Sequence, residues 1–264
     1  MALPPHAQEW LERAEIDYIG PFVKAWAAFN AWYRHASGQA HERAMLNFAI
    51  RDNNSRLRRR VLPFLQDNNT TADAERLKQA ICDLQLQLDE IHWEVTPKGR
   101  VERVSLREVC IAPKPLQDEH DDKSGQRYRA RRIQGGHIEV SVVTINNGNA
   151  KFLRVQQQYD PPSLYGLPEF TNNLSGAQQT RLRNFYDRCN PRPMVDLVQG
   201  GGPQLQVSTM HFQCTNEDLL AGLVETLYAM RNALLHGEVD PDEQVLACFE
   251  PAYKIVTCFL RSIS

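Results

Sequence analysis

One short segment near the C-terminal end, AMRNALLHGE at residues 229–238, combines residue types that could do chemistry. Arg231 precedes His236 by five positions, and Asn232 lies beside the arginine. At about 100° per helical residue, Arg231 falls inside an apolar stripe formed by Leu220, Val224, Leu227 and Leu234. Burying an unpaired guanidinium costs several kcal/mol, on the order of a whole domain's margin of stability. The helix must therefore offer Arg231 an acidic partner, a wet cleft or an anion from outside.

An arginine combined with a histidine suggests phosphodiester cleavage in RNA. The 2′-OH is an internal nucleophile, so the reaction needs one group to take its proton and another to protonate the leaving 5′-oxygen. A guanidinium suits the third task, which is to stabilise the crowded phosphate. We expect His236 to transfer protons, Arg231 to stabilise the phosphate and Asn232 to orient one of them. Because one chain supplies a single histidine, this chemistry predicts a homodimer with the ends of these helices facing each other.

The spacing alone is weak evidence, because chance often supplies it. Arg132 and His137 show the same spacing around two glycines, and we interpret that copy as coincidence. The alternative for Arg231 is a buried structural ion pair, with His236 an ordinary surface residue in a plain helical interaction protein. Replacing Arg231 should distinguish the two, because breaking a buried pair costs about 3–5 kcal/mol.

Helical patterns occupy both ends of the chain. In the N-terminal third we expect one helix from Gly20-Pro21 to Gly38, an irregular one over 40–65 that Asn53-Asn54 can break, and a third that Thr71 caps. In the C-terminal third we expect a helix near 175–186, a turn at QGGGP, and a strand over 204–214. Two long helices follow, from Thr215 to Gly237 and from Asp240 onward.

The middle of the chain changes period. HIEVSVVTI and KFLRVQQQY alternate on either side of Asn147-Gly148, which predicts a hairpin with a type I′ turn. We interpret the polar segment 116–132 as an exposed loop. Its basic part, which could follow an RNA backbone and stack a base, consists of Arg127, Tyr128, Arg129, Arg131 and Arg132. The competing interpretation is a solvated loop neutralised by the acidic residues before it.

The two helical blocks are expected to pack together, because neither apolar stripe can be buried alone. The fold class is therefore mainly α, a helical bundle with a β-hairpin-containing insert, and α+β overall. The domain prediction is residues 10–92 for the N-terminal helices, 93–174 for the insert and 175–264 for the C-terminal helices.

Composition excludes few functions. The 264 residues include 30 Lys and Arg against 32 Asp and Glu, a net charge of -2 that favours no particular partner. We expect no signal peptide and no membrane span. The six cysteines form no C-x-x-C pair, which predicts free thiols in a reducing cytosol. No His or Cys cluster has metal-ligand spacing, so we expect neither a metal nor a cofactor.

The segment RNALLHGE, followed by a last helix that begins near Pro241, resembles the HEPN superfamily (higher eukaryotes and prokaryotes nucleotide-binding domain). Its signature is Arg, often a polar residue, then His after four to six positions, which here maps to Arg231, Asn232 and His236. FVKAWAAFNAWYRHASG is also similar to the aromatic-rich first helix of large bacterial members. The resemblance covers about residues 10–92 and 175–264 and leaves out the insert.

Several expectations follow from this resemblance alone. It implies an all-α bundle, a homodimer with a composite cleft, and metal-independent endoribonuclease activity of a toxin or antiviral effector. It also implies a possible antitoxin or defence-system partner protein. Some members have lost activity, so the alternative is a silent module that binds a partner protein or a nucleotide signal. Members paired with a nucleotidyltransferase antitoxin carry Tyr two residues after the His, whereas Glu238 stands there in this chain.

Overall fold

The protein is described by a computed structural model that covers residues 17–96, 101–112, 119–134, 137–239 and 242–264. The chain divides into two compact units. The helical unit comprises Met1–Ile111 and Met194–Ser264, and the sheet unit comprises Ala112–Pro193. Helices account for 53% of the chain and strands for 17%, which agrees with the predicted α+β class.

The N-terminal helices of the helical unit begin and end where the sequence predicts. Helix α2 (Ile19–Ser37) ends at Gly38, whose φ of 60° is left-handed. The expected break separates α3 (Glu42–Arg51) from α4 (Arg56–Val61) and the 3-10 helix η1 (Leu62–Leu65). Helix α5 (Ala72–Glu90) starts at Thr71, whose side chain accepts a hydrogen bond from the Ala74 backbone.

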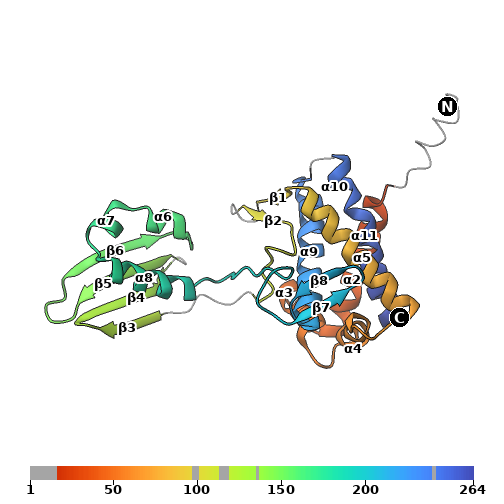
Figure 1. The fold of residues 1–264 in the computed structure, drawn as a ribbon, viewed down its shortest axis with the longest axis horizontal. Helices are drawn as coiled ribbons and strands as arrows, with labels where there is room; N and C mark the ends of the chain where they lie inside the picture. The colour runs from red at the N-terminus through yellow and green to blue at the C-terminus, as the bar shows by residue number, and fades with distance from the viewer. Residues whose placement is uncertain (1–16, 97–100, 113–118, 135–136, 240–241) are drawn as a thin grey trace. The chain divides into compact units, whose positions relative to one another are not determined.

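The C-terminal helices complete the same core. Helix α9 (Asn216–His236) has a Thr215 cap and ends at Gly237, with φ 67°. Between residues 219 and 227 it is buried on nearly all sides within the helical unit (Figure 1). The predicted last helix is split into α10 (Glu243–Ala247) and α11 (Phe249–Ile263), and α11 packs against α2 and α5. The two helical blocks therefore share one core, as predicted.

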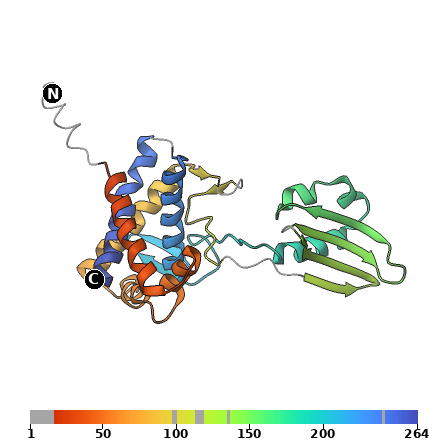
Figure 2. The same cartoon turned by 180° about the vertical axis from the view of Figure 1, so that it is seen from behind.

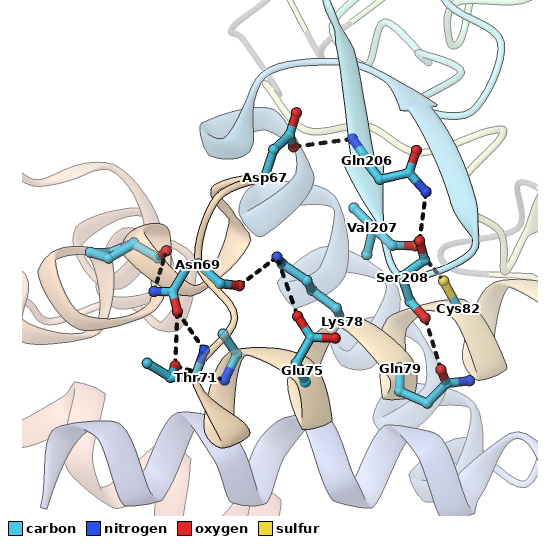
Figure 3. Close-up of polar contacts among 12 residues, drawn as sticks. Asp67, Asn69, Thr71, Glu75, Lys78, Gln79, Cys82, Gln206, Val207 and Ser208 are labelled. Atoms are coloured by element: carbon cyan, nitrogen blue, oxygen red, sulfur yellow. Dashed lines mark hydrogen bonds and ion pairs between the residues drawn. The ribbon is translucent and has the colours of Figure 1, made fainter.

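Two small hairpins lie on the helical unit. The first pairs β1 (Glu94–Val95) with β2 (Glu102–Arg103). The second pairs β7 (Gln204–Val207) with β8 (Met210–Gln213), so the single strand expected over 204–214 is a hairpin. Polar contacts fix this hairpin to α5 (Figure 3): the Ser208 hydroxyl donates to Gln79, and the Cys82 thiol to the Val207 carbonyl. The buried Lys78 beside them donates to the Asn69 carbonyl at 2.8 Å.

The sheet unit is an antiparallel meander of four strands (Figures 1 and 2). In chain order these are β3 (Glu119–Lys123), β4 (Gln126–Arg132), β5 (Ile138–Thr144) and β6 (Ala150–Gln156). Three helices, α6 (Pro161–Tyr165), α7 (Pro168–Asn172) and α8 (Gly176–Arg188), supply the rest of its core. This core includes Tyr128, Val140 and Phe152 from one face of the sheet and Leu182 and Tyr186 from α8.

The prediction of an exposed loop over 116–132 is wrong from Glu119 onward, where the chain forms β3 and β4, and residues 116–118 lie outside the described residues. The charged residues of this segment alternate with Tyr128 and Ala130, which are buried against the helices. Pairing of β3 with β4 on either side of Ser124-Gly125 supplies the backbone hydrogen bonds of this segment. The charged residues that alternate with Tyr128 and Ala130 can then lie on the opposite face of the sheet. The β5–β6 hairpin is confirmed, but its turn is not type I′. Gly148 has a positive φ of 69°, whereas Asn147 does not.

The boundaries of the two units also differ from the predicted domains. Residues 93–111 belong to the helical unit, and α8 belongs to the sheet unit although its pattern is that of a bundle helix. Helix α8 buries Leu182, Phe185 and Tyr186 in a stripe that fits a sheet as well as it fits another helix. The apolar stripe of α8 therefore does not show whether the helix packs against the sheet or against the helical bundle. The segments that connect α8 to its neighbours decide this.

Two further expectations concern cysteines and membranes. All six cysteines are free thiols, and five of them are buried. In the part of the chain that the structure describes, no helix has the length and apolar character needed to cross a membrane.

Candidate functional site

Arg231 lies where α9 leaves the core. Leu220, Val224 and Leu227 of its stripe are fully buried, whereas Arg231 and Leu234 are half-buried. The predicted stripe is therefore real, and it reaches the surface one turn after Leu227. At this position the aliphatic part of Arg231 can continue the stripe while its guanidinium meets solvent.

The guanidinium of Arg231 has few partners. It donates to the side-chain oxygen of its neighbour Asn232 at 2.8 Å, and it lies 6.0 Å from the centre of the Tyr228 ring. Among the residues that the structure describes, no carboxylate oxygen lies within 4.0 Å of it. This geometry contradicts the alternative in which Arg231 forms a buried ion pair, and it leaves most of its donors free for an anion.

A group of polar side chains from α2, α3 and α9 surrounds Tyr228, and we call it the Tyr228 cluster. Both oxygens of Glu42 accept hydrogen bonds at 3.1 Å, one from Tyr33 and one from Tyr228. Arg43 pairs with Glu225, and its guanidinium lies 5.2 Å from the centre of the Tyr228 ring. The Tyr228 ring thus contacts two guanidinium groups while its hydroxyl is held by a carboxylate, so its orientation is fixed.

Electrostatics keep both phenols of the cluster protonated. Burial raises the pKa of Tyr33 above its usual range, the Glu42 carboxylate raises it further, and Arg231 opposes this. Burial likewise raises the pKa of Tyr228, and a hydrogen bond with Asn232 opposes the rise. Both hydroxyls therefore remain hydrogen-bond donors to Glu42. The effect of Arg231 on Tyr33 also shows that its positive charge acts within this cluster.

Most of the Tyr228 cluster was not predicted from the sequence. Glu225, Tyr228 and Asn232 share one side of α9 with Arg231 at spacings of three, three and one, so helical periodicity alone could have grouped them. Glu42 and Arg43 could not be found in this way, because they lie more than 180 residues away in the chain.

His236 is exposed and is the last residue of α9. Gly237 ends the helix directly after it, as predicted. Within the described ranges the imidazole of His236 makes no hydrogen bond or ion pair with another residue. The structure therefore brings Arg231 and Asn232 together, whereas His236 lies roughly 140° further around the helix and is oriented by no partner. A direct contact between the imidazole and Arg231 of the same chain is not formed.

The predicted basic patch is arranged differently from the expectation. Tyr128 is only 4% exposed and packs under the helices, where Arg181 lies over its ring, so its predicted role in stacking a base is wrong. Strand alternation places Arg132 on the same side of β4 as Tyr128, and Arg127, Arg129 and Arg131 on the opposite side.

Other candidates lie away from the Tyr228 cluster. Arg132 and His137 lie at the connection between β4 and β5, not on a helix. A hollow of about 400 Å³ between α5 and α11 includes neither Arg231 nor His236. The described residues contain no group of three or more His, Cys, Asp or Glu side chains arranged to hold a metal ion.

Comparison of the chain with protein-family models, with curated proteins and with solved structures gave no match. The candidate site is therefore defined only by the geometry of the Tyr228 cluster in the helical unit. The HEPN resemblance of Arg231, Asn232 and His236 stays a hypothesis.

Proposed function

We propose that this protein is a metal-independent endoribonuclease of HEPN type that acts as a homodimer. The observation that carries this proposal is the half-buried Arg231, which faces solvent at the end of an apolar stripe without a carboxylate partner among the described residues. A guanidinium in this state can bind a phosphate without first breaking an ion pair. Asn232 and the fixed ring of Tyr228 hold it in place from two sides.

In this proposal His236 transfers protons and Arg231 stabilises the charge that develops on the phosphate. Attack by the 2′-oxygen forms the new P–O bond and breaks the bond to the 5′-oxygen. The 2′-OH proton leaves with a base, and an acid protonates the 5′-oxygen. The products are a 2′,3′-cyclic phosphate and a 5′-OH end. Since one chain supplies a single histidine to this site, the second proton-transfer group comes from the second copy.

The last turn of α9 supports the homodimer. Leu235 is 58% exposed beside His236, and an aliphatic side chain in that position suits an interface better than solvent. A two-fold axis near Leu235 would place two copies of His236 and Arg231 around one cleft.

A catalytically silent module is the second candidate, and one observation favours it. His236 has no partner within the described residues that would fix its tautomer, as a catalytic imidazole normally has. Such a module would bind a partner protein or a nucleotide signal through the same arginine. A toxin or antiviral role and a partner antitoxin belong to the proposal through the family resemblance alone, whereas a cytoplasmic location belongs to it through the expected reduced cysteines.

The decisive experiment incubates the purified chain, with a chelator, with total RNA and maps the ends of the products. We expect 5′-OH and 2′,3′-cyclic phosphate ends, and loss of cleavage in Arg231→Ala and His236→Ala. His35→Ala is the matched control, because His35 is also an exposed histidine in the last turn of a helix that ends at a left-handed glycine. Cleavage that survives in His236→Ala overturns the assigned mechanism.

The homodimer is tested by light scattering. Leu235→Glu should give a monomer without nuclease activity, because a buried charge would oppose the interface. Leu86→Glu changes another exposed leucine, 49% exposed on α5, and should remain a dimer. Dimers in both variants would place the interface elsewhere.

A further inference from the structure

One face of the sheet unit is not covered by the helices of that unit. The hydrophobic core of this unit takes alternate residues of β4, β5 and β6 from the opposite face. The uncovered face carries Arg127, Arg129 and Arg131 along β4 and, on the far side of β5, the apolar Leu153 and Val155 of β6, which are 59% and 45% exposed.

Two of the three arginines are neutralised by carboxylates on neighbouring strands. Arg127 donates two hydrogen bonds to Asp122 of β3, at 2.8 and 3.0 Å. Arg131 donates two to Glu139 of β5, at 2.8 and 3.2 Å. Each pair is a two-pronged contact between a guanidinium and a carboxylate that lies beside it in the sheet.

The middle arginine lacks such an anion. Strand register places Arg129 directly between His120 of β3 and Ser141 of β5, neither of which is acidic. Within the described part of the chain, the guanidinium of Arg129 donates no hydrogen bond and has no carboxylate within 4.0 Å. The pKa of Asp122 is lowered first by the hydrogen bonds from Arg127, and the positive charge of Arg129 is a lesser cause in the same direction. Among the described residues of this face, the central arginine, Arg129, therefore lacks the carboxylate that Arg127 and Arg131 each have beside them.

We propose that Arg129, with His120 beside it, binds one phosphate of a single-stranded RNA that lies across this face. This inference rests on the proposed nuclease function, because it assigns the sheet unit to holding the substrate. A guanidinium next to an exposed imidazole offers several donors to one phosphate, whereas Ser141 on the other side is only 4% exposed and is not counted as a donor. The exposed Leu153 and Val155 provide an apolar surface for the adjoining nucleotides.

The chemistry of this face also predicts how it recognises RNA. The aromatic residue expected to stack a base, Tyr128, is buried on the other side of the sheet. Contact therefore goes to the backbone, which positions the strand without reading its sequence. Binding should be insensitive to sequence and should weaken as salt increases.

The test measures binding of the full chain to a fluorescein-labelled oligodeoxythymidylate, which has no 2′-OH and cannot be cleaved. We expect Arg129→Ala to weaken binding about tenfold, as for one charge-assisted contact. The slope of log affinity against log salt should fall by about 0.7, the value for one phosphate on a single strand. Arg154→Ala is the control. Arg154 is an exposed arginine of β6 that alternates to the other face of the sheet from Leu153 and Val155, so its loss should change affinity less than twofold.

Four outcomes would overturn the inference. These are no binding by the unmodified protein, equal weakening in Arg129→Ala and Arg154→Ala, an unchanged salt slope in Arg129→Ala, and displacement of the probe by polyglutamate as effectively as by nucleic acid. The last outcome would identify an acidic protein as the partner. Cleavage of RNA is measured in parallel, so the two proposals fail separately. Binding through Arg129 without cleavage removes the nuclease function alone, and cleavage with unaltered binding in Arg129→Ala removes this site alone.

Discussion

The loss of Arg231 and the loss of Arg43 should affect stability very differently, although both arginines contact Tyr228. Arg43 pairs with Glu225, whose side chain is only 9% exposed. Arg43→Ala therefore leaves a nearly buried carboxylate without its cation. Breaking a buried pair costs about 3–5 kcal/mol. Because 37% of the Arg43 side chain is exposed, solvent screens the pair, and we expect about 2–3 kcal/mol.

Arg231→Ala leaves no carboxylate behind. It removes one hydrogen bond to Asn232 and a distant contact with the Tyr228 ring, and it introduces a residue with high helix propensity. The higher helix propensity of alanine partly offsets the loss of the hydrogen bond and of the ring contact, so the net cost in free energy of unfolding should be about 1 kcal/mol. The difference between the two variants, about 1–2 kcal/mol, measures whether Arg231 is free for a ligand or part of the structure.

Urea unfolding followed by tryptophan fluorescence suits this comparison. All four tryptophans precede residue 112, in the part of the chain that contributes to the helical unit, so the signal reports that unit. Arg231→Ala should shift the midpoint only slightly, and Arg43→Ala should shift it several times as far with an unchanged slope. An equal or larger cost for Arg231→Ala would refute this reasoning and return Arg231 to a structural role.

Two further predictions concern stability of the helical unit. Gly202→Ala should cost about 1–3 kcal/mol by overpacking, since its Cβ would lie 2.5 Å from the Gln213 carbonyl oxygen, whereas Gly201→Ala meets no atom within 4 Å and should be nearly neutral in the same urea assay. Burial raises the pKa of Cys258 to about 11 and that of Cys248 to about 12, from an ordinary value of 9.0. Thiols of the unfolded chain lose their protons at a lower pH than thiols of the folded chain. The contribution of the buried, protonated thiols to the free energy of unfolding is therefore fully present below pH 9 and is lost as pH rises toward 12. Unfolding midpoints measured at pH 8 and pH 10 should show the decline, and a midpoint that rises over this interval would contradict it.

The sequence by itself determined the features that depend on neighbours within a few positions. Gly38 and Gly237 end α2 and α9 because a left-handed residue without a Cβ stops a helix locally. Thr71 and Thr215 begin α5 and α9 by accepting a backbone hydrogen bond three residues on. The position of Arg231 on an apolar stripe follows from helical period alone.

Only the tertiary structure decided which faces meet. The charged segment of β3 and β4 resembles a loop until pairing with β5 separates its buried side from its charged side. The stripe of α8 packs against the sheet and not against the bundle, and Glu42 reaches Tyr228 across more than 180 residues of chain. Such contacts depend on the complementarity of surfaces that the chain brings together from distant positions, and no local period or cap records which surfaces those are.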